Sequence, residues 1–117
     1  YYAIPKALSD TYGIYRFGFH GISHSYLWEQ YARHTGKHDA KIITLHLGAG
    51  CSASATAKGL PVDTSMGFTP NEGLIMATRC GNIDPQVVQY LSQKEHKSQS
   101  EILKLINAKS GLFGLSG

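Results

Sequence analysis

The alternation of apolar and polar positions predicts a short helix, a group of three strands and then further helices. Residues 5–12 fit the first helix. Gly13 is expected to end it, because glycine readily takes the left-handed conformation of a C-terminal cap. Residues 14–19 alternate as the residues of a half-buried strand do.

A second helix is predicted after this strand. Ser23 is a suitable N-cap residue, and the helical pattern continues to about Thr35, with Gly36 at the C′ position. Leu27 and Tyr31 lie four residues apart, so we expect them to share the buried face of this helix.

The middle of the chain has the pattern of an antiparallel β-meander. Residues 41–47 are rich in β-branched side chains and form the strongest predicted strand. A glycine-rich turn at residues 48–50 separates them from a second strand of small residues at 51–57. Lys58-Gly59 is a two-residue turn signal that leads into a third strand at 60–64.

The pattern becomes helical beyond the strands. Residues 69–72 (Thr-Pro-Asn-Glu) combine an N-cap residue, a proline at the first helical position and a capping-box glutamate. They predict a helix that continues to about Arg79 and stops at Gly81.

Two more helices are predicted toward the C-terminus. Asp84-Pro85 is expected to open a helix that continues to about Gln93. Ser98 and Glu101 form a second capping box. The helix that follows is expected to end near Gly111 and to place these residues on one face: Ile102, Leu105 and Ile106.

This order of elements predicts an α/β fold in which an antiparallel β-meander is flanked by helices in a layered core. The chain begins at Tyr1 rather than at a methionine, and it ends in a glycine-punctuated apolar stretch, 111–117. We therefore expect residues 1–117 to be a piece of a larger domain, with one face of the core left uncovered.

The composition argues against several classes of protein. Hydrophobic residues make up 42% of the chain and charged residues 16%, which is typical of an ordered globular protein. The net charge of +3 is small and the lysines are scattered, so no nucleic-acid partner is predicted. No apolar stretch is long enough to span a bilayer, so no membrane partner is predicted. The two cysteines, Cys51 and Cys80, lack CxxC spacing, which favours a reducing, cytoplasmic compartment.

The glycine-rich turn at 48–50 is the first candidate for chemistry. Within residues 45–52 (LHLGAGCS), a strand feeds a turn whose glycines let the backbone approach an anion closely. No Gly-Lys-Ser/Thr follows, so this is not a P-loop. The local pattern alone equally fits an ordinary hairpin.

His20 is the second candidate. It stands between glycines in residues 18–24 (GFHGISH), just before a predicted helix, where an anion is favoured. A capped or core histidine is the alternative interpretation. His24 lies four residues further on, but the glutamate of an HExxH metal site is absent and no metal site is predicted.

Arg79 is the third candidate, at the end of a predicted helix and before a glycine turn. There its guanidinium can reach a cleft and stabilise charge on a transferring phosphoryl group. It equally fits a cation that interacts with the helix dipole. Asp63 is more simply explained by a turn network. Cys51 and Cys80 are more simply explained as small buried residues than as nucleophiles.

Taken together, these segments resemble the acetate and propionate kinase family, which belongs to the actin, Hsp70 and sugar-kinase superfamily. Order and spacing agree across almost the whole chain. The matching stretches are 16–24 (RFGFHGISH), 45–50 (LHLGAG), 62–70 (VDTSMGFTP) and 72–85 (EGLIMATRCGNIDP). The resemblance implies two RNase H-like domains, of which residues 1–117 form part of the second, nucleotide-binding domain, with the N-terminal domain and the C-terminal remainder missing.

The resemblance also implies an activity: reversible phosphoryl transfer between ATP and acetate, or another short-chain carboxylate, to give acetyl phosphate and ADP, with Mg²⁺. It implies that His20 and Arg79 stabilise the transition state. It further implies homodimerisation and a set of residues that contact the ATP phosphates: His46, Leu47, Gly48, Ala49 and Gly50.

The chain departs from the family's usual pattern at some positions. Ala49 stands where an asparagine is common, and Asn82 stands where an aspartate is common. The family's catalytic aspartate and its metal-holding residues have no counterpart in this segment. Residues 1–117 alone are therefore expected to be inactive. The alternative function is a nucleotide-binding module without turnover.

Overall fold

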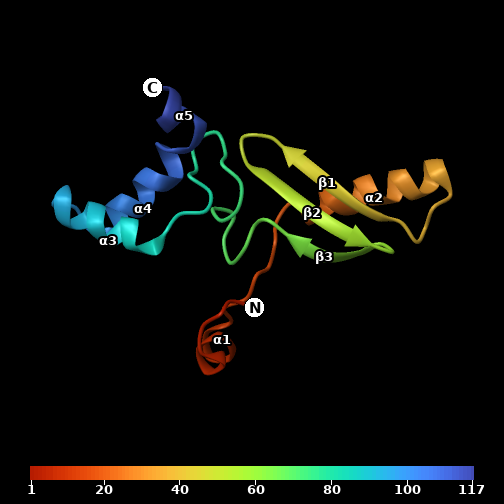
Figure 1. Ribbon diagram of the computed structural model, residues 1–117, viewed down its shortest axis with the longest axis horizontal. Helices are drawn as coiled ribbons and strands as arrows, with labels where there is room; N and C mark the ends of the chain where they lie inside the picture. Colours follow the sequence, from red (N-terminus) through yellow and green to blue (C-terminus); the bar gives the residue numbers. More distant parts are fainter.

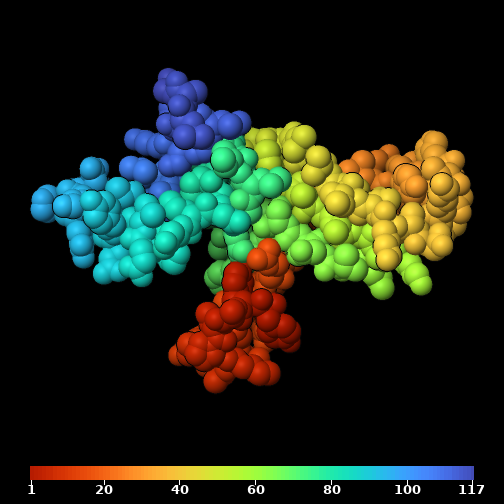
Figure 2. Space-filling view, in the orientation of Figure 1, coloured from red at the N-terminus to blue at the C-terminus, as the bar shows by residue number.

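The computed structural model describes all residues, 1–117, in three groups of elements (Figure 1). A short N-terminal helix stands apart from a sheet that carries one helix, and the remaining helices gather on the other side of a long loop. In the space-filling view the N-terminal residues, in red, project as a separate lobe (Figure 2). The elements are α1 (Lys6–Tyr12), α2 (Gly21–Thr35), β1 (Lys41–Leu47), β2 (Cys51–Ala57), β3 (Leu60–Thr64), α3 (Pro85–Lys94), α4 (Gln99–Ala108) and α5 (Gly111–Ser116).

The arrangement is open and thin. The radius of gyration is 17.1 Å and the shortest axis measures 17 Å. A compact chain of this length would have a radius of gyration of about 13 Å. Only 14 of the 117 residues are buried. The expectation that one face of the core lies uncovered is confirmed.

The predicted β-meander is confirmed. The strands lie antiparallel in the order β1-β2-β3, and β1 pairs with β2 from Lys41↔Ala57 to Leu47↔Cys51. Lys58 and Gly59 connect β2 to β3 with φ values of 52° and 79°, the left-handed pair that a tight hairpin requires.

The two faces of the sheet differ in chemistry. Helix α2 covers the face that carries the inward-pointing residues of β2, which are Ser52, Ser54 and Thr56 and are all buried. This interior is therefore polar, and its hydroxyl groups need hydrogen-bond partners. On the opposite face, three large apolar side chains of β1 are exposed: Ile43, Leu45 and Leu47.

Helix α2 begins three residues before the predicted start. His20 occupies the N-cap position with φ 60°, in the left-handed region, and Ser23 lies inside the helix. The predicted cap was wrong because the Ser23 hydroxyl contacts His46 instead of a backbone N–H. The end of the helix is as predicted, since the Gly36 N–H donates to the Ala32 carbonyl.

The buried face of α2 was also predicted incorrectly. Leu27 remains 39% exposed. A different face of the helix meets the sheet. It carries His24 and Ala32, which are eight residues apart, or about two helical turns, and are both buried. Trp28 lies on the same face and packs over the Gly59 turn.

Residues 14–19 form no strand, contrary to the prediction. The N–H groups of Phe17 and Gly18 both point to the single carbonyl of Gly67, at 3.1 and 3.4 Å. One shared acceptor does not make a ladder, so the segment is extended chain that lies against the loop after β3.

The helix predicted from residue 70 to Arg79 is absent, and residues 65–84 form a long loop. The Glu72 carboxylate, expected to cap a helix, instead accepts from Arg16 at 2.8 Å and from the Tyr2 hydroxyl. Gly73 adopts φ 107°, which no helix tolerates, and its N–H donates to the Asn82 side chain at 2.8 Å. The loop contains two fully buried methionines, Met66 and Met76.

The C-terminal helices agree with the cap signals. Asp84 accepts from the Gln86 N–H at the start of α3, and Ser98 and Glu101 form the predicted capping box of α4. Ile102 and Ile106 of α4 are buried as expected. Helix α5 was not predicted. None of the helices is long and apolar enough to cross a membrane.

Candidate active site

Three segments that are distant in the sequence meet at the turn after β1. His20 arrives at the start of α2, His46 lies near the end of β1, and Arg79 comes from the 65–84 loop. The imidazoles of His20 and His46 are stacked, with ring centroids 3.8 Å apart and planes 16° from parallel. The start of α2 and the end of β1 thus hold these two imidazoles against each other.

Gly50 lies directly beside both proposed stabilising groups. A methyl group built on its Cα would lie 3.1 Å from Arg79 Nη1 and 3.5 Å from His20 Cε1. The same methyl would lie 3.7 Å from His20 Nε2. Glycine is therefore the residue that lets the imidazole, the guanidinium and the turn approach one another.

The ring of His20 is oriented by a buried hydroxyl. Its Nδ1 lies 2.9 Å from Ser52 Oγ, and Ser52 is fully buried on β2. This contact leaves the Nε2 edge of the ring facing the turn. His46 is fixed in the same way, because its Nδ1 lies 3.1 Å from Ser23 Oγ.

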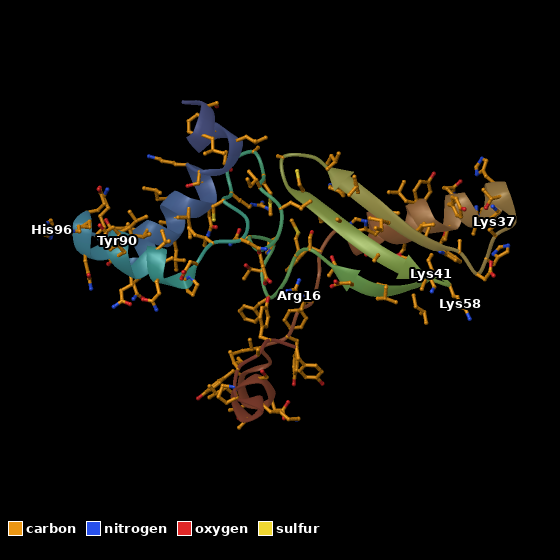
Figure 3. All side chains as sticks on the ribbon, in the orientation of Figure 1. Arg16, Lys37, Lys41, Lys58, Tyr90 and His96 are labelled. Carbon is orange, nitrogen blue, oxygen red and sulfur yellow. The ribbon has the colours of Figure 1, made fainter.

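Arg79 carries a charge that no carboxylate within residues 1–117 neutralises. Its Nη1 donates to the Pro70 carbonyl at 3.1 Å, which holds the guanidinium in place without cancelling its charge. An arginine oriented in this way is suited to an anionic ligand. Three lysines lie instead at the other end of the sheet, away from the turn at 48–50: Lys37, Lys41 and Lys58 (Figure 3).

The turn itself offers backbone donors. The Gly48 N–H donates to the Gly50 carbonyl at 3.1 Å, and the Ala49 carbonyl accepts from the Ala77 N–H at 3.2 Å. The N–H groups of Ala49 and Gly50 donate to no group within residues 1–117. Free successive amides beside a cation are suited to phosphate oxygens, and Ala49 offers its amide whatever its side chain.

Two histidines, His20 and His24, favour the neutral form. Burial lowers the pKa of His20, and electrostatic interaction with the neighbouring His46 ring and the Arg79 guanidinium lowers it further. Burial also lowers the pKa of His24, followed by the effects of His20 and His46. At neutral pH these rings therefore act as neutral hydrogen-bonding groups rather than as cations.

Comparison with known proteins identifies the family. The family model described as "Acetokinase family" matches residues 1–117. The chain belongs to the acetokinase family. Acetate kinase from Helicobacter acinonychis is 52% identical over 118 residues, and acetate kinase from Halothermothrix orenii is 50% identical over the same length. Each alignment covers 99% of this chain and 30% of the relative.

Solved structures of acetokinases agree in fold. The acetate kinase of Porphyromonas gingivalis matches with a TM-score of 0.94 and 41% identity, over 100% of this chain and 30% of that one. A propionate kinase from Francisella tularensis matches with a TM-score of 0.95 and 45% identity, over 99% of this chain and 30% of that one. The expected fold, a piece of an RNase H-like, actin-like ATPase domain, is confirmed. The chain corresponds to a fragment, because it spans about 30% of the length of these relatives.

The other candidates have simpler explanations in the structure. The Asp63 carboxylate accepts from the Thr64 N–H at 2.8 Å, which supports the turn interpretation. Burial raises the pKa of the Cys80 thiol, and Cys51 Sγ contacts the Gly48 carbonyl at 3.5 Å. Both ring nitrogens of His24 contact hydroxyl groups, which leaves neither for a metal.

Sequence reasoning missed Ser52 and His24. Three hydroxyl side chains alternate along β2, and this pattern indicates a polar inner face. His24 lies one helical turn after His20, on the side of α2 that meets that face. Nothing in the local sequence, however, pairs a helix residue with a strand residue 28 positions later.

Proposed function

We propose that the full-length protein that contains this chain catalyses reversible phosphoryl transfer between ATP and acetate, or another short-chain carboxylate, giving acetyl phosphate and ADP. The observation that carries the proposal is the meeting of His20, Arg79 and the Gly48–Gly50 turn at one point, in a chain of the acetokinase family. The two solved structures described above are named as an acetate kinase and a propionate kinase.

The reaction places specific demands on these residues. A carboxylate oxygen forms a bond to the γ-phosphorus while the bond from that phosphorus to the ADP oxygen breaks, and its electron pair stays on ADP. Negative charge spreads over the three other oxygens of the transferring group, so the protein's main task is positioning and neutralisation. The Arg79 guanidinium and the His20 Nε2–H are proposed to donate to those oxygens.

The turn is proposed to hold the nucleotide phosphates. The free amides of Ala49 and Gly50 would donate to phosphate oxygens, beside His46 and Leu47 at the end of β1. Mg²⁺ prefers oxygen ligands, and this site presents imidazoles and a guanidinium instead. Residues 1–117 contain no group of three or more side chains arranged to hold a metal ion. Ligands for the Mg²⁺ that accompanies ATP are proposed to lie elsewhere in the full-length protein.

The wider organisation follows the family. Residues 1–117 are proposed to form part of the second, nucleotide-binding domain of a two-domain kinase. The full-length protein is proposed to be a cytoplasmic homodimer. The segment alone is expected to be inactive, because the N-terminal domain and the C-terminal remainder of the kinase are missing from it.

The test is turnover by the full-length protein. Acyl phosphate is trapped with hydroxylamine in the presence of Mg-ATP and acetate, propionate or butyrate in separate reactions. ATP-dependent acyl hydroxamate with at least one of these acids is the expected result. The alternative, a nucleotide-binding module without turnover, predicts a calorimetric signal for Mg-ATP with no acyl hydroxamate from any of the three acids.

A further inference from the structure

Ser52 connects the site to the interior of the sheet. It is fully buried, and its Oγ lies 2.9 Å from His20 Nδ1 and 2.8 Å from His24 Nε2. His24 is buried as well, and its Nδ1 lies 2.7 Å from Thr44 Oγ1. Two hydroxyls and two imidazoles thus form one continuous chain of hydrogen bonds that ends at the reacting edge of His20.

The protons in this chain can be counted. A neutral imidazole has one donor and one acceptor nitrogen, and a hydroxyl donates one hydrogen bond. The Ser52 hydroxyl could accept from both rings only by leaving its own buried hydrogen without an acceptor. With both rings neutral and every hydrogen paired, all the bonds therefore run in the same direction. If Thr44 donates to His24, then His24 donates to Ser52, Ser52 donates to His20 Nδ1, and the proton of His20 lies on Nε2. If the direction is reversed, Thr44 donates to the Ser54 carbonyl, 3.4 Å away, and His20 Nε2 carries a bare lone pair.

The two directions have opposite consequences for an anion. The Nε2 edge of His20 faces Gly50 and the Arg79 guanidinium. A phosphoryl oxygen only accepts hydrogen bonds, so it binds an Nε2–H and is repelled by a lone pair. The alternative donor, an imidazolium, is disfavoured because burial, His46 and Arg79 all lower the pKa of His20. The tautomer of the neutral ring therefore decides whether His20 can help.

We propose that Ser52 is a positioning residue for phosphoryl transfer: its hydroxyl donates to Nδ1 of His20 and so keeps the proton on Nε2, where it meets the transferring group. Ser52 does not touch the substrate. Thr44 and His24 orient Ser52: Thr44 donates to His24 Nδ1, so the proton of His24 lies on Nε2, which donates to Ser52 Oγ. The inference rests on the function proposed above and gives a role in that site to a residue to which the family resemblance assigned none.

The structure supplies a matched control. Ser54 lies two residues along the same strand, on the same buried face, and its hydroxyl donates to the Asp63 carbonyl at 3.3 Å instead of to an imidazole. Ser52→Ala and Ser54→Ala therefore each delete one buried hydroxyl from the same inner face. Only Ser52→Ala removes the donor to His20.

The first measurement is steady-state kinetics of the full-length enzyme with ATP and the carboxylate that it uses. Ser52→Ala is expected to lower kcat about tenfold while KM for ATP changes less than about twofold, since direct loss of a stabilising donor costs about 10²-fold or more. Ser54→Ala is expected to retain wild-type kcat. Equal kcat values for Ser52→Ala and the wild type would overturn the proposal, as would equal losses in both variants.

The second measurement reads the tautomer directly in the wild-type protein. The ¹⁵N chemical shifts of His20 are recorded in full-length wild-type protein labelled on histidine and assigned with His20→Gln. A protonated Nε2 and an unprotonated Nδ1 are expected, and a proton on Nδ1 alone overturns the inference. If wild-type protein shows no turnover but the Nε2–H tautomer is present, the proposed function has failed and the hydrogen-bond direction stands.

Discussion

The imidazole of His46 lies flat against that of His20, with 3.8 Å between ring centroids. The two rings do not compete for the same partner, because each Nδ1 has its own serine, Ser23 for His46 and Ser52 for His20. Two stacked rings cannot both hold a positive charge without strong repulsion. This stacking is one reason that the pKa of His20 lies below its ordinary value of 6.5, after burial itself.

His46→Asn is therefore expected to raise the pKa of His20 toward its ordinary value, because one of the groups that lower it is gone. The pKa would be measured from the pH titration of the His20 ring proton signals in the full-length protein. Ser23→Ala is the control, since it removes the hydroxyl that contacts His46 Nδ1 but leaves the His46 imidazole in the protein. A His20 pKa that stays unchanged in His46→Asn would show that the stacked ring has no electrostatic influence.

The neutral histidines also predict how stability depends on pH. The pKa values of His20 and His24 are lowered in the folded protein, so the unfolded chain binds more protons as pH falls. The free energy of unfolding is therefore expected to be greatest above about pH 6.5, the ordinary histidine pKa, and to decrease as pH falls below it. Urea unfolding between pH 5 and 8 would measure this. The loss of unfolding free energy on going from pH 8 to pH 5 should be smaller in His24→Gln than in the wild type. An equal loss in the two proteins would contradict the lowered pKa of His24.

Arg79→Ala is expected to reduce kcat of the full-length enzyme by about 10²-fold to 10³-fold, since it removes a charged donor from the transition state. Arg79→Lys should recover only part of that loss, because an ammonium lacks the planar fork that the Pro70 carbonyl holds in place. Arg33→Ala, on the exposed last turn of α2, should keep wild-type kcat. Wild-type turnover in Arg79→Ala would exclude the kinase interpretation of this residue.

The glycines of the turn give a matched pair. A Cβ at Gly50 would lie 3.1 Å from Arg79 Nη1, closer than ordinary van der Waals contact, so Gly50→Ala must displace the guanidinium. A loss in kcat of about tenfold to 10²-fold is expected, the range caused by displacements of up to about 1 Å. A Cβ at Gly48 meets nothing closer than 3.5 Å. Gly48→Ala should therefore have the smaller effect, and the reverse order would contradict the geometry.

The loop that presents Arg79 depends on Gly73. This residue adopts φ 107°, and a Cβ there would lie 2.4 Å from the Ser65 carbonyl oxygen. Gly73→Ala is expected to destabilise the full-length protein by about 2 kcal/mol or more, seen as a lower Tm. Gly21→Ala is the control, because its backbone is helical and its Cβ would meet nothing within 4 Å. Equal Tm values for the two variants would refute the constraint at Gly73.

The sheet was predictable because its signals are local. The Lys58-Gly59 hairpin, the β-branched run of 41–47 and the cap signals of α3 and α4 each act within a few residues, and all of them appear in the structure. The meeting of His20 with Arg79 was expected only through resemblance to a family. No rule of spacing joins two side chains that are 59 positions apart in the sequence.

Two of the failures share a physical cause, which is tertiary competition for a local group. Glu72 was expected to cap a helix, but Arg16 and Tyr2 bind its carboxylate and the helix does not form. Ser23 was expected to cap α2, but its hydroxyl contacts His46. In both cases a polar side chain that suits a helix end is used by a distant partner, which a single sequence does not reveal.

The sheet described above is bare on one side and has β1 and β3 at its two edges. Unpaired edge strands beside exposed Ile43, Leu45 and Leu47 form a template for pairing with further copies of the same strand. Residues 1–117 expressed alone will therefore tend to self-associate or aggregate through β1. Assays of chemistry therefore belong with the complete polypeptide.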